Sequence, residues 1–592
     1  MNFVKIKKES FVTLLYALLS SAILYYCLEL GNKNPFMNGF FYTFVNVLTV
    51  FLIQSAVYIL FQRWWLASVI TSIPLTLLSV ANYYTIMFRN QPISTQDIHN
   101  AGTTLSVIGS YKFPITVYVI AIIVFFVLNL LVAGTLYSRE KGKRSKIKNV
   151  LIKDTCIVLF ATLFVNTVYL GENPIKPRNT FVWSWEESYH TYGYAASSIE
   201  VLQNSLDMVN TPYEYSTEKV QVSAEKTVVP KRDNLPDIIF ILNETFYDLR
   251  DIISIETDTS VMPYIDSLKY TGRCVVAGTG GGTNKSEYEL LTSNSVQLMP
   301  GITPFNYLDF RDANSIVSYV KTLGYKTWGA HCAESLNYSR GKVYPLLGFD
   351  NILFAKEFGN KEKYKSRSYA TDSFCYNKMI EDYENMGQDP RFMYLLTIQN
   401  HGGWDLNDEV HDIVHSLTDF GEYTDDINEF LSCIKLSDMA FKELTDYFSK
   451  SSRPVVICMV GDHAPSFAPE LVDTSNQDTV LKLRSTPYVI WANFKLDNTN
   501  IPLTSMPYIV PTTLNTSNIP LSNFYSYILN MQKEVPVITA FNKYFDKNGN
   551  RFDYNQNSDY TDIVNGYFAL EYNNVNTEGD RIQKYFEPQL SE

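Results

Sequence analysis

Five long apolar stretches occupy the first 170 residues, whereas the rest of the chain alternates short apolar runs with polar segments. The five stretches lie near residues 11–30, 41–61, 65–88, 115–137 and 150–170. Each has about the 20 residues that a helix needs to cross roughly 30 Å of hydrocarbon. The first is too long for a cleaved signal peptide, and we interpret it as an anchor. The pattern therefore predicts a five-span transmembrane domain over residues 1–170.

Basic residues in the short loops indicate how these spans are oriented. They precede the first span, follow the second span at Arg63, and cluster between the fourth and fifth spans in residues 139–148. All three segments fall on one side of a five-span arrangement, and the positive-inside rule makes that side cytoplasmic. We therefore expect a multi-pass protein of the cell membrane, with a cytoplasmic N-terminus. An odd number of spans places everything after residue 170 outside the cell.

The polar half of the chain changes character at about residue 231. Residues 171–230 are interrupted by prolines, which predicts a juxtamembrane connector with some helix near residues 194–208. Residues 231–592 contain short apolar runs rich in β-branched residues, at 237–242, 274–277, 326–329, 392–398, 455–460 and 488–491. Buried strands that alternate with longer segments are typical of an α/β domain with a mostly parallel central sheet.

Charge and cysteine content narrow the function classes. Residues 1–170 carry 14 Lys and Arg against 5 Asp and Glu, a formal charge of +9. Because the whole chain has a formal net charge of −12, residues 171–592 carry −21. An acidic outer half argues against nucleic-acid binding. Five of the seven cysteines lie outside the predicted spans, without a CxxC pair or regular spacing. A disulfide framework and a zinc finger are therefore not expected.

Polar residues follow the predicted strands at the points where the strands end. The run at 237–242 ends in Asn243-Glu244, and the run at 274–277 leads through a glycine-rich segment to Thr283. The other three strand ends carry His331, His401, and the pair Asp462-His463. Ligands of open α/β sheets bind beyond the carboxyl ends of the strands, so these five clusters are expected to converge on one edge.

Three of these clusters suggest metal and phosphoryl chemistry. Asp462 and His463 can both coordinate a cation, and a hydroxyl at Thr283, placed by glycines at a helix N-terminus, is well sited to attack phosphorus. Each has a structural alternative. Glu244 could instead cap the next helix, and the glycine run could be only a flexible loop.

With these residues in place, nearly the whole chain resembles the lipoteichoic acid synthase family of phosphoglycerol transferases, a membrane branch of the sulfatase and alkaline phosphatase superfamily. The motifs that carry the resemblance are Asn243-Glu244-Thr245-Phe246, Gly282-Thr283 followed by Ser286-Glu287-Tyr288-Glu289, and Gly461-Asp462-His463. The resemblance implies five transmembrane helices followed by an extracellular sulfatase-like α/β domain with a mostly parallel sheet.

The resemblance also implies roles for individual residues. Thr283 would be the nucleophile, and one divalent cation, usually manganese in the family, would be surrounded by Glu244, Thr283, Asp462 and His463. Magnesium or zinc suits the same donor set. The glycerol phosphate headgroup would be bound by His331, Tyr338, Arg340 and, through the Asn400-His401 element, His401. Tyr338 stands where lipoteichoic acid synthases usually have Trp.

The implied function is transfer of glycerol phosphate from a membrane lipid, phosphatidylglycerol, to an extracellular glycopolymer or glycolipid through a covalent phospho-threonine. The alternative is a phosphoethanolamine transferase that acts on an envelope sugar or lipid. A catalytically silent scaffold is a further alternative. The spans are either a plain anchor or help to hold the lipid through the outer loop after span three, which contains Asp97 and His99.

Overall fold

The structure is a computed structural model that forms two compact units, Met1–His99 with Lys112–Leu206, and Asn100–Tyr111 with Asp207–Glu592. It describes residues 2–34, 38–89, 92–93, 113–142, 147–170, 174–175, 185–206, 235–299, 302–359, 365–404, 412–497, 501–575 and 581–588. The predicted lipid-binding loop around Asp97 and His99 lies outside these residues, as does most of the predicted connector.

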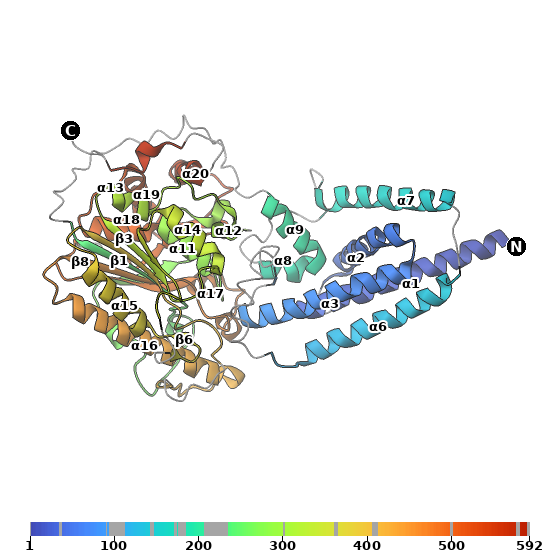
Figure 1. Cartoon of the computed structure of the whole chain (residues 1–592), viewed down its shortest axis with the longest axis horizontal. Coiled ribbons are helices and arrows are strands. Elements are labelled where there is room, and N and C mark those ends of the chain that lie inside the picture. Colours follow the sequence, from blue (N-terminus) through green and yellow to red (C-terminus); the bar gives the residue numbers. More distant parts are fainter. Residues whose placement is uncertain are drawn as a thin grey trace. The chain divides into compact units, whose positions relative to one another are not determined.

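The first unit contains the five predicted spans (Figure 1). They are α1 (Asn2–Gly31), α2 (Phe40–Phe61), α3 (Trp64–Arg89), α6 (Val117–Glu140) and α7 (Ile147–Val165). Within the described residues, five helices are long and apolar enough to cross a membrane, as the sequence predicts. Polar side chains join the helices internally: Ser20 donates to Asn129 Oδ1 at 2.7 Å and accepts from Gln54 Nε2 at 2.9 Å.

Two further helices, α8 (Trp185–Tyr192) and α9 (Tyr194–Leu206), belong to this same unit. The backbone N–H of Tyr194 donates to Glu29 Oε1 at 2.7 Å, and that of Ala196 donates to Asn46 Oδ1 at 2.9 Å. Side chains of α1 and α2 therefore satisfy the first amides of α9, which a helix cannot satisfy by itself. The helix expected near residues 194–208 is present. The division of the chain at residues 170 and 230 stays a prediction.

The second unit is built on an eight-stranded sheet in the order β10-β2-β9-β8-β1-β7-β3-β4. Its strands are β1 (Asp237–Asn243), β2 (Thr271–Val275), β3 (Lys326–His331), β4 (Asn351–Leu353), β7 (Arg391–Leu396), β8 (Val455–Gly461), β9 (Ser485–Ala492) and β10 (Leu503–Ser505). Strand β9 pairs antiparallel with both β8 and β2, and the other pairings are parallel. The predicted α/β domain with a mostly parallel sheet is confirmed.

Helices cover both faces of this sheet (Figure 1). Ile238, Phe240 and Leu242 of β1 point into one core, and Ile239 and Ile241 point into the other, as alternation along a strand requires. The first core is covered by α11 (Thr283–Thr292), α13 (Ile316–Thr322), α14 (Arg340–Leu347), α18 (Met506–Thr516), α19 (Asn523–Glu534) and α20 (Thr561–Val575). The second is covered by α15 (Asp372–Asn385) and α16 (Thr424–Phe448).

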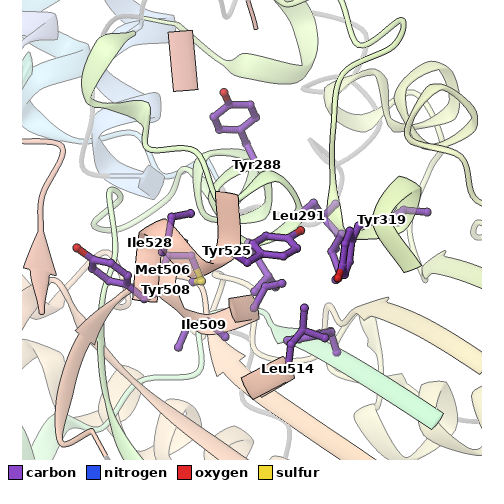
Figure 2. Close-up of a cluster of buried hydrophobic side chains, with 14 of the residues drawn as sticks. Tyr288, Leu291, Tyr319, Met506, Tyr508, Ile509, Leu514, Tyr525 and Ile528 are labelled. Carbon is purple, nitrogen blue, oxygen red and sulfur yellow. The ribbon is translucent and has the colours of Figure 1, made fainter. Parts of the chain in front are cut away.

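The C-terminal part of α11 is held in a dense cluster of aromatic and aliphatic side chains. Figure 2 shows Tyr288 and Leu291 of α11 among side chains of α13, α18 and α19. The rings of Tyr319 and Tyr525 meet edge to face, with centroids 5.1 Å apart. Such packing gives a helix one position, and it therefore determines where the first residue of α11, Thr283, is presented.

Candidate active site

Three potential metal ligands meet where β1 and β8 end. These strands are neighbours, with Asn243 paired to Gly461, so the residues that follow them lie side by side. Glu244, Asp462 and His463 are all buried, and their ligand atoms lie within 4.8 Å of one another. His463 Nε2 is 3.3 Å from Asp462 Oδ2 and 3.5 Å from Glu244 Oε1.

Thr283 joins this cluster from the N-terminus of α11. Its hydroxyl donates to Glu244 Oε2 at 3.2 Å and lies 3.4 Å from His463 Nε2. The approach is a tight glycine turn: Gly280, Gly281 and Gly282 have φ of 64°, 156° and 96°, values that side chains rarely allow. The structure thus brings together all four residues that the resemblance assigned to one metal site.

The backbone between the ligands is strained and close-packed. Thr245 has φ of 48°, unusual for a β-branched residue. Its N–H donates to Asp462 Oδ1 at 2.7 Å, and its hydroxyl donates to Glu244 Oε1 at 2.8 Å. A Cβ at Gly461 would lie 2.0 Å from the carbonyl oxygen of Phe246, so only glycine fits there. Thr245 therefore orients both carboxylates, and strain of this kind is typical of functional sites.

The electrostatics of the cluster favour a cation. Burial and the negative charge of Glu244 raise the pKa of Asp462 to about 7. Among the described residues, the buried Oδ2 of Asp462 has no hydrogen-bond partner. Burial opposes a charged His463, but Asp462 and Glu244 outweigh it and raise the pKa of this imidazole. Two buried carboxylates that repel each other are stabilised by a positive charge between them.

The donor set fits a divalent cation. His463 Nδ1 lies 2.9 Å from the carbonyl oxygen of Ala464 and donates to it, which leaves the Nε2 lone pair for a metal. With Asp462 Oδ2, a Glu244 oxygen and the Thr283 hydroxyl, the set is three oxygens and one nitrogen. Such a mixed set suits manganese, magnesium or zinc.

A buried network of polar side chains holds Asn243, the residue that precedes Glu244, and the sequence analysis did not predict this network. Asn243 Nδ2 donates to Asp372 Oδ2 at 2.9 Å, and the Ser437 hydroxyl donates to the same oxygen at 2.6 Å. Asn400 Nδ2 donates to Asn243 Oδ1 at 3.0 Å. Burial raises the pKa of Asp372 to about 6. Asn243 and Asn400 belong to motifs that the sequence analysis names, whereas no local pattern marks Asp372 and Ser437, which come from α15 and α16.

Arg340 contacts α11 through Glu287. Both residues are buried, and Arg340 Nε donates to Glu287 Oε2 at 2.8 Å. Glu287 also accepts from the Tyr344 hydroxyl at 2.6 Å. Glu287 follows Thr283 by four residues and therefore lies about one helical turn from it. Through this ion pair, Arg340 is held near the same face of α11. The Arg340 guanidinium carbon lies 5.0 Å from the Tyr338 ring centroid, which joins two of the predicted headgroup residues.

The two predicted headgroup histidines occupy different surroundings. His331 is buried at the end of β3, and its Nδ1 donates to the carbonyl oxygen of Leu396 at 3.1 Å. His401 lies close enough to Glu244 and His463 to interact with their charges, and its pKa is lowered, chiefly by burial. Its Nδ1 is 3.1 Å from the Tyr369 hydroxyl. Arg367 donates to the His401 backbone oxygen at 2.9 Å and holds this loop, a role that the sequence did not indicate.

Two basic residues near the glycine turn before Thr283 were not identified from the sequence. Lys285 lies in the first turn of α11, and burial and the positive charge of Arg484 lower the pKa of Lys285 to about 8. Arg484 donates to the carbonyl oxygen of Ala277 at 2.5 Å, in the loop that leads to Thr283. Positive charge beside the turn favours an anionic ligand.

We expect loss of Glu287 to destabilise the sulfatase-like unit strongly. In Glu287→Ala, Arg340 would remain buried without its carboxylate partner, and breaking a buried ion pair from one side costs about 3–5 kcal/mol. The measurement is thermal unfolding of the purified full-length protein. The double variant Glu287→Gln with Arg340→Met should recover part of the loss, and removal of the exposed pair Lys442–Asp446 should change nothing measurable. A Glu287→Ala protein that unfolds like the wild type would contradict this account of the pair.

Comparisons with known proteins agree with this fold. Residues 236–519 match the model of the sulfatase family. A protein of Rhizobium meliloti (strain 1021) named for cyclic beta-1,2-glucan modification is 23% identical over 327 residues, which cover 53% of this chain and 50% of that protein. The capsular polysaccharide biosynthesis protein RkpI of the same organism is 26% identical over 251 residues, 41% of this chain and 44% of that one. The chain thus spans about half the length of these curated relatives.

A solved structure shows the same fold. The Streptococcus pyogenes phosphoglycerol transferase GacH, in complex with sn-glycerol-1-phosphate, has 17% sequence identity and a TM-score of 0.52, covering 65% of this chain and 100% of that chain. Residues 236–519 therefore form a sulfatase-like domain, which the chain combines with five apolar helices. The sulfatase-like part of the resemblance is confirmed, and the phosphoglycerol transferase branch stays a prediction.

Proposed function

We propose that this protein transfers glycerol phosphate from phosphatidylglycerol to a glycopolymer or glycolipid acceptor outside the cell. The observation that carries the proposal is the Thr283 hydroxyl, presented at the N-terminus of α11 at 3.2 Å from Glu244 Oε2 and 3.4 Å from His463 Nε2. A nucleophile beside a proton acceptor and potential metal ligands is the arrangement that phosphoryl transfer requires. A scaffold without activity would not need this constellation.

The reaction is a double displacement. Thr283 Oγ attacks the lipid phosphorus as its proton passes to Glu244 Oε2, and the bond from phosphorus to the diacylglycerol oxygen breaks. His401, which interacts with the charge of Glu244, is proposed to give a proton to the departing oxygen. The acceptor hydroxyl then attacks the same phosphorus as its proton passes to His401, the bond to Thr283 Oγ breaks, and Glu244 returns its proton to this oxygen, so that free threonine and both proton carriers are restored.

The divalent cation would be held by Glu244, Thr283, Asp462 and His463. When bound, it supplies positive charge that lowers the pKa of the Thr283 hydroxyl and neutralises phosphoryl oxygens. Manganese is the proposed ion. Residues His331, Tyr338, Arg340 and His401 are proposed to bind the glycerol phosphate headgroup, with Lys285 and Arg484 adding positive charge near the turn.

The acceptor is proposed to be a glycan. The curated relatives are named for glucan modification and capsular polysaccharide biosynthesis, which supports a carbohydrate acceptor. The five spans would keep the enzyme at the membrane that holds its lipid donor, with the N-terminus in the cytoplasm and residues 231–592 outside. A protease added to intact cells should then cleave within residues 231–592; complete protection would contradict this orientation.

The deciding experiment is the mass of the adduct on Thr283. Purified full-length protein with manganese is exposed to phosphatidylglycerol, digested and analysed by mass spectrometry, with diacylglycerol release followed in parallel. We expect a glycerol phosphate adduct on the peptide that contains Thr283. A phosphoethanolamine adduct formed instead from phosphatidylethanolamine would reassign the donor, and diacylglycerol release without any adduct would contradict the covalent mechanism.

A further inference from the structure

A cavity lies in the sulfatase-like domain, and its lining residues are not those of the cluster around Thr283. It has a volume of about 740 Å³ and is formed by α17 (Gln477–Leu483), α18, α19, β10 and the small sheet of β11 (Val537–Ile538), β12 (Lys543–Phe545) and β13 (Arg551–Asp553). Volumes of 300–1,000 Å³ are typical of small-molecule sites. None of its lining residues belongs to the proposed catalytic machinery.

The floor of this cleft is polar and held in place. Gln532 and Thr512 are nearly fully buried, and Gln532 Nε2 donates to the hydroxyls of Thr504 at 2.9 Å and Thr512 at 3.1 Å. Leu503, Val537 and Phe545 add apolar surface beside them. A rigid site with polar and apolar walls suits a ligand whose own surface alternates hydroxyl groups with C–H faces.

The charges around the cleft balance in number, with Lys533, Lys547 and Arg551 against Asp478, Glu534 and Asp546. Arg551 pairs with Asp478, and Lys547 pairs with Glu534 at 2.8 Å. The Asp546 carboxylate is used by its own turn, where it accepts from the Asn548 N–H at 2.9 Å and from the Asn550 N–H at 2.8 Å. A site for a chain of phosphates would present an excess of positive charge. The lining therefore favours a neutral, hydroxyl-rich ligand over an anionic polymer.

The cleft is connected to the nucleophile turn by α17. Leu481 lines the cleft and packs in one small core with Val275, the last residue of β2, from which the glycine loop runs to Thr283. Arg484 directly follows α17, and it donates to Ala277 in that same loop. The cleft therefore contacts the strand and the helix that support the loop leading to Thr283.

We propose that this cleft binds the neutral sugar units of the glycan acceptor. The inference rests on the proposed transferase function and adds the acceptor site to it. The cleft then selects the acceptor, while the cluster around Thr283 handles the lipid donor.

The test blocks the cleft without touching the catalytic cluster. Asn515 lines it and is exposed, so Asn515→Trp should fill its mouth and leave the core intact. Asn557→Trp, at an exposed turn residue outside the lining, is the matched control. Binding of a neutral glucan hexasaccharide is measured by saturation-transfer NMR on full-length protein. Thr283→Ala is measured alongside, so that binding is read without turnover.

We expect the hexasaccharide to bind the wild type, Asn557→Trp and Thr283→Ala, and to bind Asn515→Trp at least tenfold more weakly. With phosphatidylglycerol, Asn515→Trp should keep the acceptor-free rate of diacylglycerol release but show a tenfold higher KM for the hexasaccharide. Equal binding to Asn515→Trp, no binding to the wild type, or binding only of a glycerol phosphate hexamer would overturn the proposal. Failure of diacylglycerol release in the wild type would instead contradict the proposed function, and the binding experiment would still decide the cleft.

Discussion

Thr283→Ala is expected to abolish turnover of the lipid donor. The variant removes the only atom that the proposed mechanism uses to attack phosphorus, and removal of a catalytic nucleophile lowers kcat by about 10³-fold or more. The measurement is diacylglycerol release from phosphatidylglycerol by full-length protein with manganese, together with the mass of the peptide that contains Thr283.

Two controls separate chemistry from folding in this experiment. Thr283→Ser keeps a hydroxyl at the same position and should retain the adduct at a reduced rate. Thr292→Ala alters a buried threonine at the other end of α11, whose hydroxyl bonds only the Tyr288 carbonyl and the Asn294 N–H among the described contacts, and should form the adduct normally. Turnover that survives in Thr283→Ala at the wild-type rate would remove this residue from the mechanism.

Asp462→Asn is expected to lower manganese affinity by at least about 100-fold, more than the 10–100-fold typical for residues that only support ligands. The change removes the negative charge of a carboxylate whose buried Oδ2 has no hydrogen-bond partner among the described residues and lies 3.3 Å from His463 Nε2. It also removes one of two carboxylates that repel each other, because Glu244 contributes to the raised pKa of Asp462. The chelator-treated variant should therefore melt no lower than chelator-treated wild type.

Isothermal titration calorimetry with manganese chloride measures this affinity, and thermal unfolding with and without the metal provides a second reading. Ligand binding to the folded state at 100 times Kd stabilises a protein by about 2.7 kcal/mol, a gain that Asp462→Asn should lose. Asp473→Asn is the matched control, because Asp473 is exposed and, among the described contacts, bonds only its own turn. Undiminished binding to Asp462→Asn would exclude Asp462 as a ligand.

Strand prediction succeeded where burial was strong and failed at the edges of the sheet. The six apolar runs all correspond to strands, because strands buried on both faces read as continuous apolar segments. β4 and β10 have three residues each and lie at the two ends of the strand order, where a strand needs little apolar sequence. Their pairing is decided by the neighbouring strand, which a local pattern does not contain.

The same limit applied to the site. The resemblance implies that Arg340 binds phosphate, and this role stays a prediction; the contact of its buried Nε with Glu287 at 2.8 Å, between residues 53 positions apart, could not be predicted from the sequence. Asp372 accepts from Asn243 and from Ser437 behind Glu244, and neither Asp372 nor Ser437 carries a sequence signal, because their helices meet only in the folded domain.

The five apolar spans, the α/β class and the polar residues at the strand ends could be predicted from the sequence, because hydrophobic runs and strand ends are set by residues that are neighbours in the chain. Convergence of the strand ends on one edge could be expected too. The distances could not: Glu244 and His463 are 219 positions apart, and the Thr283 hydroxyl lies 3.2 Å from Glu244 Oε2 and 3.4 Å from His463 Nε2 only in the folded domain. The order of the sheet places β1 beside β8 and the turn after β2 at the same edge, and side-chain partners exist only once that order is formed.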